Sequence, residues 1–358
     1  MDQHAAALSW LRSLGDPVVD VRLARDLPGV AGPPVAELRA RVRADPRVAA
    51  VLAGQHGDGS WGPAGGSSRR VLPTLWRAQL LAELGLDAGS ERWQSAVGFL
   101  DACASTPEGV FSRTGTCDGV LACYVGLAAT TYLLGGRRDL AAPQIDWMVR
   151  HQEVRHRGRS LRPDGAVLYR PHLRTRYGGC MAESTTCLVG LARNGRALEL
   201  WRRRGPAPEV EPLLAAVREA FLRRRVFQRA DGTVVPVGTP ASRADDWLLP
   251  TFPTDWRPDL IEVVDLVARS GPADERLRPA VDVLRSHRLP DGSWPLRRSF
   301  WPTGVPPIER RSRHRGSRLA TARAVCALAA AAPSEAVGRR PPPRTPPWRT
   351  PVVRRAPG

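Results

Sequence analysis

Apolar residues recur at intervals of three and four positions along most of this sequence, and this spacing predicts a chain of α helices. The segments 120–134 and 180–192 contain hardly a charged residue, and a helix that is apolar on all sides is a buried one. We therefore expect these two segments, with 73–86 and 317–332, to be inner helices. Outer helices are expected at 139–152, 211–227 and 274–287. Further helices are expected at 4–14, at 35–53 with a break or kink at Pro46, at 91–104 and at 259–269.

An acidic residue followed by glycine separates these helices at five places. The clearest case is Gln55-His-Gly-Asp58-Gly59-Ser-Trp61, and the closest repeat is Asp291-Gly292-Ser-Trp294. An Asp-Gly pair supplies the positive φ angle that ends a helix, and a large side chain two positions later can fold back over the turn. Weaker versions lie at 107–111, 164–168 and 231–235, so the unit is a helix, an acidic-glycine turn and a second helix. Its spacing of about 50 to 70 residues favours one closed array.

The turns at Gln55, Gly59 and Trp61 and at Asp291, Gly292 and Trp294 resemble the repeat shared by squalene-hopene cyclases, oxidosqualene cyclases and the β subunits of protein prenyltransferases. The resemblance implies an all-α fold, a single α/α toroid with an inner and an outer ring of helices around a cavity. In these families the motif is a structural clasp, so it implies the fold rather than the reaction. The segments from Cys117 onward also resemble uncharacterised bacterial toroid proteins with the same repeats. We expect an N-terminal helical arm and connector at 1–36, the toroid at 37–335 and a disordered Pro/Arg-rich tail at 336–358.

The net charge of +18 is carried by arginine alone, because the sequence contains no lysine among its 53 basic residues. This excludes Schiff-base chemistry and a Walker A loop, both of which need lysine. No nucleic-acid-binding motif surrounds the arginines, so we expect no nucleic-acid partner. The amino terminus does not resemble a signal peptide, the six cysteines lack CxxC spacing and no apolar run is long enough for a membrane span. We expect a cytoplasmic protein with reduced thiols.

Carbocation chemistry needs a buried acid and aromatic walls. The aspartate motifs typical of class II and class I terpene enzymes, Asp-x-Asp-Asp and Asp-Asp-x-x-Asp, are absent. The candidate acids are Asp118 and Asp255, although carboxylates near 255–262 are also typical of a first helical turn, where they complement the helix dipole. The candidate substrate-binding residues are aromatic: Tyr124, Trp247, Phe252 and Trp256.

Thiolate and imidazole ligands suit zinc, and the related prenyltransferases and lanthionine cyclases hold zinc in this way. The candidate ligands are Cys117, Cys180 and Cys187, with His172 or His314 as the nitrogen partner. Cys180 and Cys187 are two helical turns apart and can share one helix face. The alternative is that these cysteines are small core residues.

The function that this sequence suggests is that of a terpenoid cyclase or prenyltransferase acting on an isoprenoid in a central apolar cavity. Two alternatives stay open. One is a toroid without catalytic activity that binds an apolar ligand or a partner protein, and the other is a zinc-thiolate enzyme on the same toroid.

Overall fold

The protein is all α-helical in the computed structural model, which describes residues 3–27, 29, 32–152, 154, 187–229, 231–235, 237 and 245–332. Within these residues strand-like pairing occurs only as isolated β-bridges. The helices are α1 (Gln3–Ser13), α2 (Pro17–Asp26), α3 (Val35–Arg43), α4 (Pro46–Leu52), α5 (Val71–Glu83), α6 (Glu91–Ala104), α7 (Ala122–Leu134), α8 (Arg138–His151), α9 (Leu188–Arg202), α10 (Glu211–Leu222), α11 (Leu260–Arg269), α12 (Arg278–Ser286) and α13 (Arg318–Ala331).

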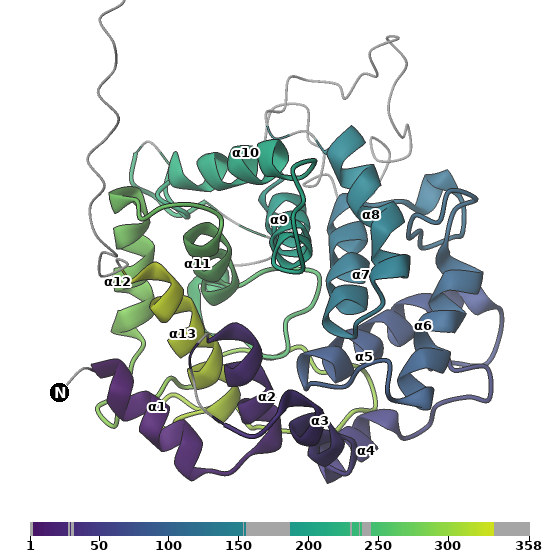
Figure 1. Ribbon diagram of the computed structural model, residues 1–358, viewed down its shortest axis with the longest axis horizontal. Helices are drawn as coiled ribbons and strands as arrows, with labels where there is room; N and C mark the ends of the chain where they lie inside the picture. Colours follow the sequence, from purple (N-terminus) through teal and green to yellow (C-terminus); the bar gives the residue numbers. More distant parts are fainter. Residues whose placement is uncertain are drawn as a thin grey trace, which may run out of the picture.

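The inner helices form a closed ring, which is the α/α toroid that the repeat predicts (Figure 1). Around the ring α5 contacts α7, α7 contacts α9, α9 contacts α11 and α11 contacts α13. The ring closes from α13 through α2, α3 and α4 back to α5. The outer helices α6, α8, α10, α12 and α1 pack on α5, α7, α9, α11 and α13 respectively. The uncharged segment at 120–134 therefore gives the inner helix α7, whereas the inner helix α9 carries Arg193, Arg196 and Glu199.

The acidic-glycine turns share one geometry. Gly59, Gly109, Gly232 and Gly292 all have φ between 78° and 88°, the left-handed region that glycine tolerates best. At Gly59 a Cβ atom would also lie 2.2 Å from the carbonyl oxygen of Ser95, so only glycine fits this position. The turn at 164–168 lies outside the described residues.

Trp61 and Trp294 fold back over their turns in the same manner. The backbone N–H of Trp61 donates to Thr74 Oγ1 at 3.0 Å, and that of Trp294 donates to Thr321 Oγ1 at 2.9 Å. Each indole N–H donates to a carbonyl of the preceding helix segment, and both side chains are almost fully buried. Each tryptophan thus links the helix before its turn to the inner helix that follows.

Helices α7 and α9 of the ring approach each other closely. A Cβ atom on Gly126 would stand 2.4 Å from Asn194 Oδ1 and 2.5 Å from the carbonyl carbon of Arg193. Because Gly126 has no side chain, the two backbones can come this close. Helix α7 packs against its ring neighbour α9 at this contact, which agrees with the inner position that its uncharged sequence predicts.

One sequence expectation differs from the structure. The expected connector after residue 14 contains α2, whose N-cap Asp16 accepts a hydrogen bond from the Val18 backbone N–H. The break expected at Pro46 is confirmed, because Asp45 caps a new helix there and 35–53 forms two helices. The tail at 336–358 lies outside the described residues, and the domain boundaries stay a prediction. In the part of the chain that the structure describes, every helix is too short or too polar to cross a membrane.

Candidate functional site

An ion-pair network occupies the centre of the ring. Glu83 on α5 pairs with Arg22 of α2 and with Arg196 of α9. Arg196 also pairs with Glu262 of α11 at 3.1 Å. Since α5 and α9 are not neighbours around the ring, this chain of charges crosses it from one side to the other. The sequence predicts a central apolar cavity. In the structure, the two hollows described below are instead lined by many charged side chains.

Arg193 is the most deeply buried cation of this network. Its side chain is 0% exposed, and Nη1 donates to both carboxylate oxygens of Glu262 at 2.7 Å. Its other nitrogens donate to the backbone carbonyls of Asp255, Trp256 and Arg257 at 2.5, 3.1 and 2.6 Å. Arg193 therefore fixes the segment before α11 against α9.

Asp259 and Arg323 form a second buried pair, which links α11 to α13. The two carboxylate oxygens of Asp259 accept from Arg323 at 2.7 and 2.8 Å. Asp259 also caps α11 by accepting from the Glu262 backbone N–H at 3.0 Å, and it accepts from the Thr251 N–H. Asp259 therefore stabilises the start of α11, as the sequence suggested, and it also forms an ion pair with Arg323 of α13.

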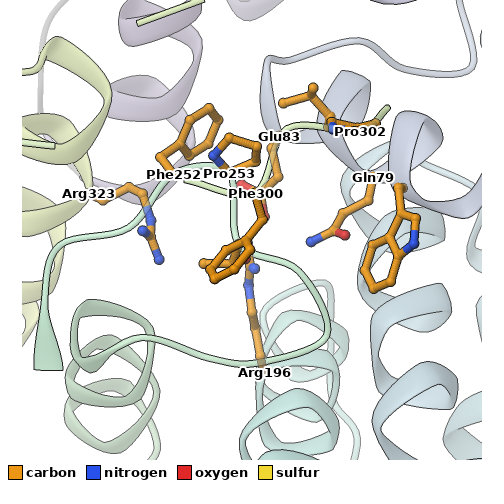
Figure 2. Close-up of a pocket in the computed structure, with 11 residues that line it drawn as sticks. Gln79, Glu83, Arg196, Phe252, Pro253, Phe300, Pro302 and Arg323 are labelled. Atoms are coloured by element: carbon orange, nitrogen blue, oxygen red, sulfur yellow. The ribbon is translucent and has the colours of Figure 1, made fainter. Parts of the chain in front are cut away.

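One hollow at the end of this network is lined by aromatic side chains, and we call it the aromatic hollow (Figure 2). The hollow is small and partly open to solvent, and the centre of a water molecule can move within only about 10 Å³ of it. Figure 2 shows Arg196 and Arg323 reaching into it from different sides, with Phe252 and Phe300 beside them. Its lining residues are Trp76, Gln79, Leu80, Glu83, Arg196, Phe252, Pro253, Thr254, Phe300, Pro302 and Arg323.

The carboxylate that lines the aromatic hollow is a poor proton donor. Burial alone would raise the pKa of Glu83, but the charges of Arg196 and Arg22 outweigh it and lower the pKa to about 2. Glu83 is therefore ionised at neutral pH. The two arginines in the wall are in turn held by Glu83, Glu262 and Asp259, so the wall presents fixed ion pairs rather than an acid.

Phe300 is held in place by two arginines. The Arg257 guanidinium lies 4.4 Å from its ring centroid, and that of Arg298 lies 5.1 Å away. The Phe300 backbone N–H donates to the Pro253 carbonyl at 3.1 Å. The connection between α12 and α13 thus places the Phe300 side chain in the wall of the hollow. The same connection contacts α5, because the Thr303 carbonyl accepts a hydrogen bond from Arg77 Nη2.

The structure brings one of the four predicted aromatic residues, Phe252, to the aromatic hollow. Tyr124 is half-buried and lies edge-on to Trp76, a lining residue, with centroids 5.8 Å apart. Trp247 is buried and donates its indole N–H to the Val235 carbonyl at 2.9 Å, while Trp256 is half-buried against Arg257. The last two lie outside the lining.

The predicted acids lie elsewhere. Asp255 is half-buried, pairs with Arg257 at 2.5 Å and lines neither described hollow. Asp118 belongs to a short 3₁₀ turn, Cys117–Gly119, which precedes α7 rather than opening it. Their catalytic roles stay predictions.

The cysteine site is tested only in part, because Cys180 and His172 lie outside the described residues. Cys117 is exposed in its turn, and His314 is exposed in the connection before α13. Cys187 caps α9, and its sulfur accepts from the Gly190 N–H at 3.3 Å. Among described residues, no group of three or more His, Cys, Asp or Glu side chains is arranged to hold a metal. Zinc binding stays a prediction.

The residues that sequence reasoning missed are the charged ones inside inner helices. Glu83, Arg193, Arg196 and Arg323 each interrupt a largely apolar helix. Charges rarely lie in fully buried positions unless they are paired, so this pattern was an available signal. The identity of each partner was not available, since the pairs join distant segments.

No family model matches this sequence, and no curated protein is similar to it. Similar solved structures include two of variants of the type II terpene cyclase MstE from Scytonema, each in complex with its substrate geranylgeranyl dihydroxybenzoate. They are 14% and 16% identical to this chain, cover 83% of it and 98% of their own length, and both have a TM-score of 0.31. At these values the likeness carries no information about the site. The toroid rests on the helix contacts themselves.

Proposed function

We propose that this protein binds an isoprenoid-like ligand at the mouth of the aromatic hollow with one end of the ligand inside, as a binding protein rather than as a cyclase that protonates its substrate. The observation that carries the proposal is that Trp76, Phe252 and Phe300 line one hollow together with Leu80 and two prolines. Pockets for small ligands are concave and mostly apolar with a few placed polar groups. The flat faces of these rings suit an unsaturated hydrocarbon chain, and Gln79, Arg196 and Arg323 can meet a polar head.

The charge state of Glu83 argues against cyclisation started by proton transfer. A carboxyl group donates a proton efficiently only when its pKa lies near the working pH. The pKa of Glu83 is about 2 because two arginines stabilise its charged form. Binding therefore fits the described wall better than acid catalysis does.

Fluorescence titration of the purified protein with farnesol and with farnesyl diphosphate tests this proposal, with inorganic diphosphate as the probe without a hydrocarbon chain. We expect saturable binding of at least one of the two farnesyl compounds and much weaker binding of diphosphate alone. Trp76→Leu removes part of the ring surface and should weaken binding by about 10-fold, the effect of one lost aromatic contact.

Trp10 provides the matched control. It is half-buried like Trp76, but it belongs to the outer helix α1 and lies outside the lining. Trp10→Leu should leave farnesyl binding unchanged. The proposal is wrong if neither farnesyl compound binds the wild-type protein, or if both tryptophan variants weaken binding equally.

A further inference from the structure

Two uncharged polar side chains in the wall of the aromatic hollow have no hydrogen-bond partner among the described residues. Gln79 of α5 is 3% exposed, and Thr254, in the segment before α11, is 8% exposed. Within the described part of the chain, neither the Gln79 amide nor the Thr254 hydroxyl makes a hydrogen bond. Buried polar groups in native proteins nearly always have a partner, so these two groups point to a partner that enters the hollow from outside.

The Gln79 amide points into the hollow. Figure 2 shows its side chain extending from α5 toward Phe300. Gln79 lies one helical turn before Glu83, on the face of α5 that forms the wall. The amide therefore reaches the space that the aromatic rings enclose, where a ligand atom can meet it.

The size of the hollow limits which chemical group can reach Gln79. The centre of a water molecule can move within only about 10 Å³ of it. A cavity needs roughly 10 to 15 Å³ of such space to hold one water molecule. A hydroxyl group is about the size of a water molecule and fits, whereas a diphosphate group, with its several oxygens, does not. The hollow therefore admits one small end group of a ligand.

The arginines of the same wall are already paired with carboxylates. Arg196 donates from Nη1 to Glu262 at 3.1 Å and from Nη2 to Glu83. Both terminal nitrogens of Arg323 donate to Asp259, at 2.8 and 2.7 Å. An anionic head group would have to compete with these carboxylates for the guanidinium groups, and a neutral hydroxyl group does not. The charges in the wall therefore favour a neutral head over an anionic one.

The second hollow, where α2, α9 and α11 meet, lacks uncharged polar side chains. Apart from three leucines, its lining residues are four arginines and four carboxylates: Arg22, Arg25, Arg196 and Arg203, with Asp26, Glu199, Glu262 and Asp265. These charges pair largely with one another. Of the two hollows, the aromatic hollow is therefore the one that can recognise a neutral ligand through hydrogen bonds.

We propose that the ligand of the aromatic hollow ends in a neutral hydroxyl group and that Gln79, with Thr254, recognises this group. This inference rests on the proposed function, because it needs an isoprenoid-like chain at the mouth of the hollow. A hydroxyl group both donates and accepts a hydrogen bond, and the Gln79 amide offers an acceptor oxygen and two N–H donors. Gln79 is thus the residue that selects an isoprenoid alcohol over a hydrocarbon or a diphosphate.

Comparing farnesol with farnesene tests this role, because farnesene is a hydrocarbon of similar length without the hydroxyl group. Tryptophan fluorescence gives the affinity of both compounds for the wild type and for Gln79→Met, which keeps the length of the side chain but lacks the amide. The difference in how water dissolves the two compounds is the same for both proteins, so it cancels when their affinity ratios are compared. The ratio of farnesol affinity to farnesene affinity should be about 10-fold lower in Gln79→Met, the effect of one lost hydrogen bond. The wild type should also bind farnesol more tightly than farnesyl diphosphate.

Gln94→Met is the matched control, since Gln94 is an exposed glutamine of the outer helix α6 and lies outside the lining. Its affinity ratio should equal that of the wild type. Circular dichroism establishes that the variants are folded, and Thr254→Val, which lacks the hydroxyl, should also lower the ratio and carries the test if Gln79→Met does not fold.

The possible failures are distinguishable. If neither farnesol nor farnesyl diphosphate binds the wild type, the proposed function is wrong and this inference falls with it. If binding occurs but the ratio in folded Gln79→Met equals that of the wild type, the inference alone is overturned, and water rather than a ligand hydroxyl is the partner of Gln79. Tighter binding of farnesyl diphosphate than of farnesol overturns it as well.

Discussion

Replacing Arg193 by methionine tests whether the central ion pairs hold the ring together. The change leaves Glu262 with Arg196 at 3.1 Å as its remaining ion-pair partner, and it removes the donors to three backbone carbonyls. Removing one partner of a buried ion pair costs about 3 to 5 kcal/mol. Each carbonyl left unsatisfied adds about 1 kcal/mol, although local rearrangement recovers part of this. We therefore expect a loss of about 4 to 6 kcal/mol in the free energy of unfolding.

Urea unfolding followed by circular dichroism at 222 nm, roughly the helix minimum, measures this loss as a lower midpoint at an unchanged slope. The double variant Arg193→Met, Glu262→Met removes both charges, so it should be more stable than the single variant. Arg276→Met, which breaks an exposed ion pair, should cost at most about 1 kcal/mol. If Arg193→Met costs no more than Arg276→Met, the central pairs do not stabilise the ring and the reasoning is refuted.

Three further predictions concern stability. Trp61→Ala deletes a side chain that is 1% exposed and should cost about 3 to 5 kcal/mol in urea unfolding; an unchanged midpoint would show that the turn does not clasp the helices. Gly126→Ala should lower the melting temperature, because the new Cβ would lie 2.4 Å from Asn194 of α9. Gly98→Ala in α6 is the control: it has open space around it, so it should raise the melting temperature slightly. Equal shifts for the two variants would contradict the close packing. Glu199→Gln should change how the free energy of unfolding depends on pH. Folded Glu199 keeps its proton up to about pH 7, whereas the unfolded chain loses it near pH 4.5. The stability of the wild type should therefore fall by roughly 3 kcal/mol between these two pH values, and the variant should lack this fall. Parallel pH profiles for the wild type and Glu199→Gln would show that this carboxyl has an ordinary pKa in the folded protein.

The sequence by itself determined most of the helices and their order, because both follow from local properties. The apolar spacing of a segment sets its buried face, and Gly59 and Gly292 shape the turns between helices through a φ angle that few other residues adopt. The uncharged segment at 120–134 contains the inner helix α7 because it has no charged side chain that must reach solvent. The repeated turn then predicts a ring, since equivalent helices pack against equivalent neighbours.

Only the tertiary structure decided what fills the centre of that ring. Arg193 and Glu262 lie 69 residues apart, and Arg196 and Glu83 lie 113 apart, so neither pairing is encoded by local spacing. An arginine in an apolar helix predicts that some carboxylate must meet it, but which one depends on how the whole ring closes. The charge state of a buried group has the same origin, because it is set by the neighbours that the fold brings within a few ångströms: two arginines keep Glu83 ionised, whereas burial keeps Glu199 protonated to about pH 7.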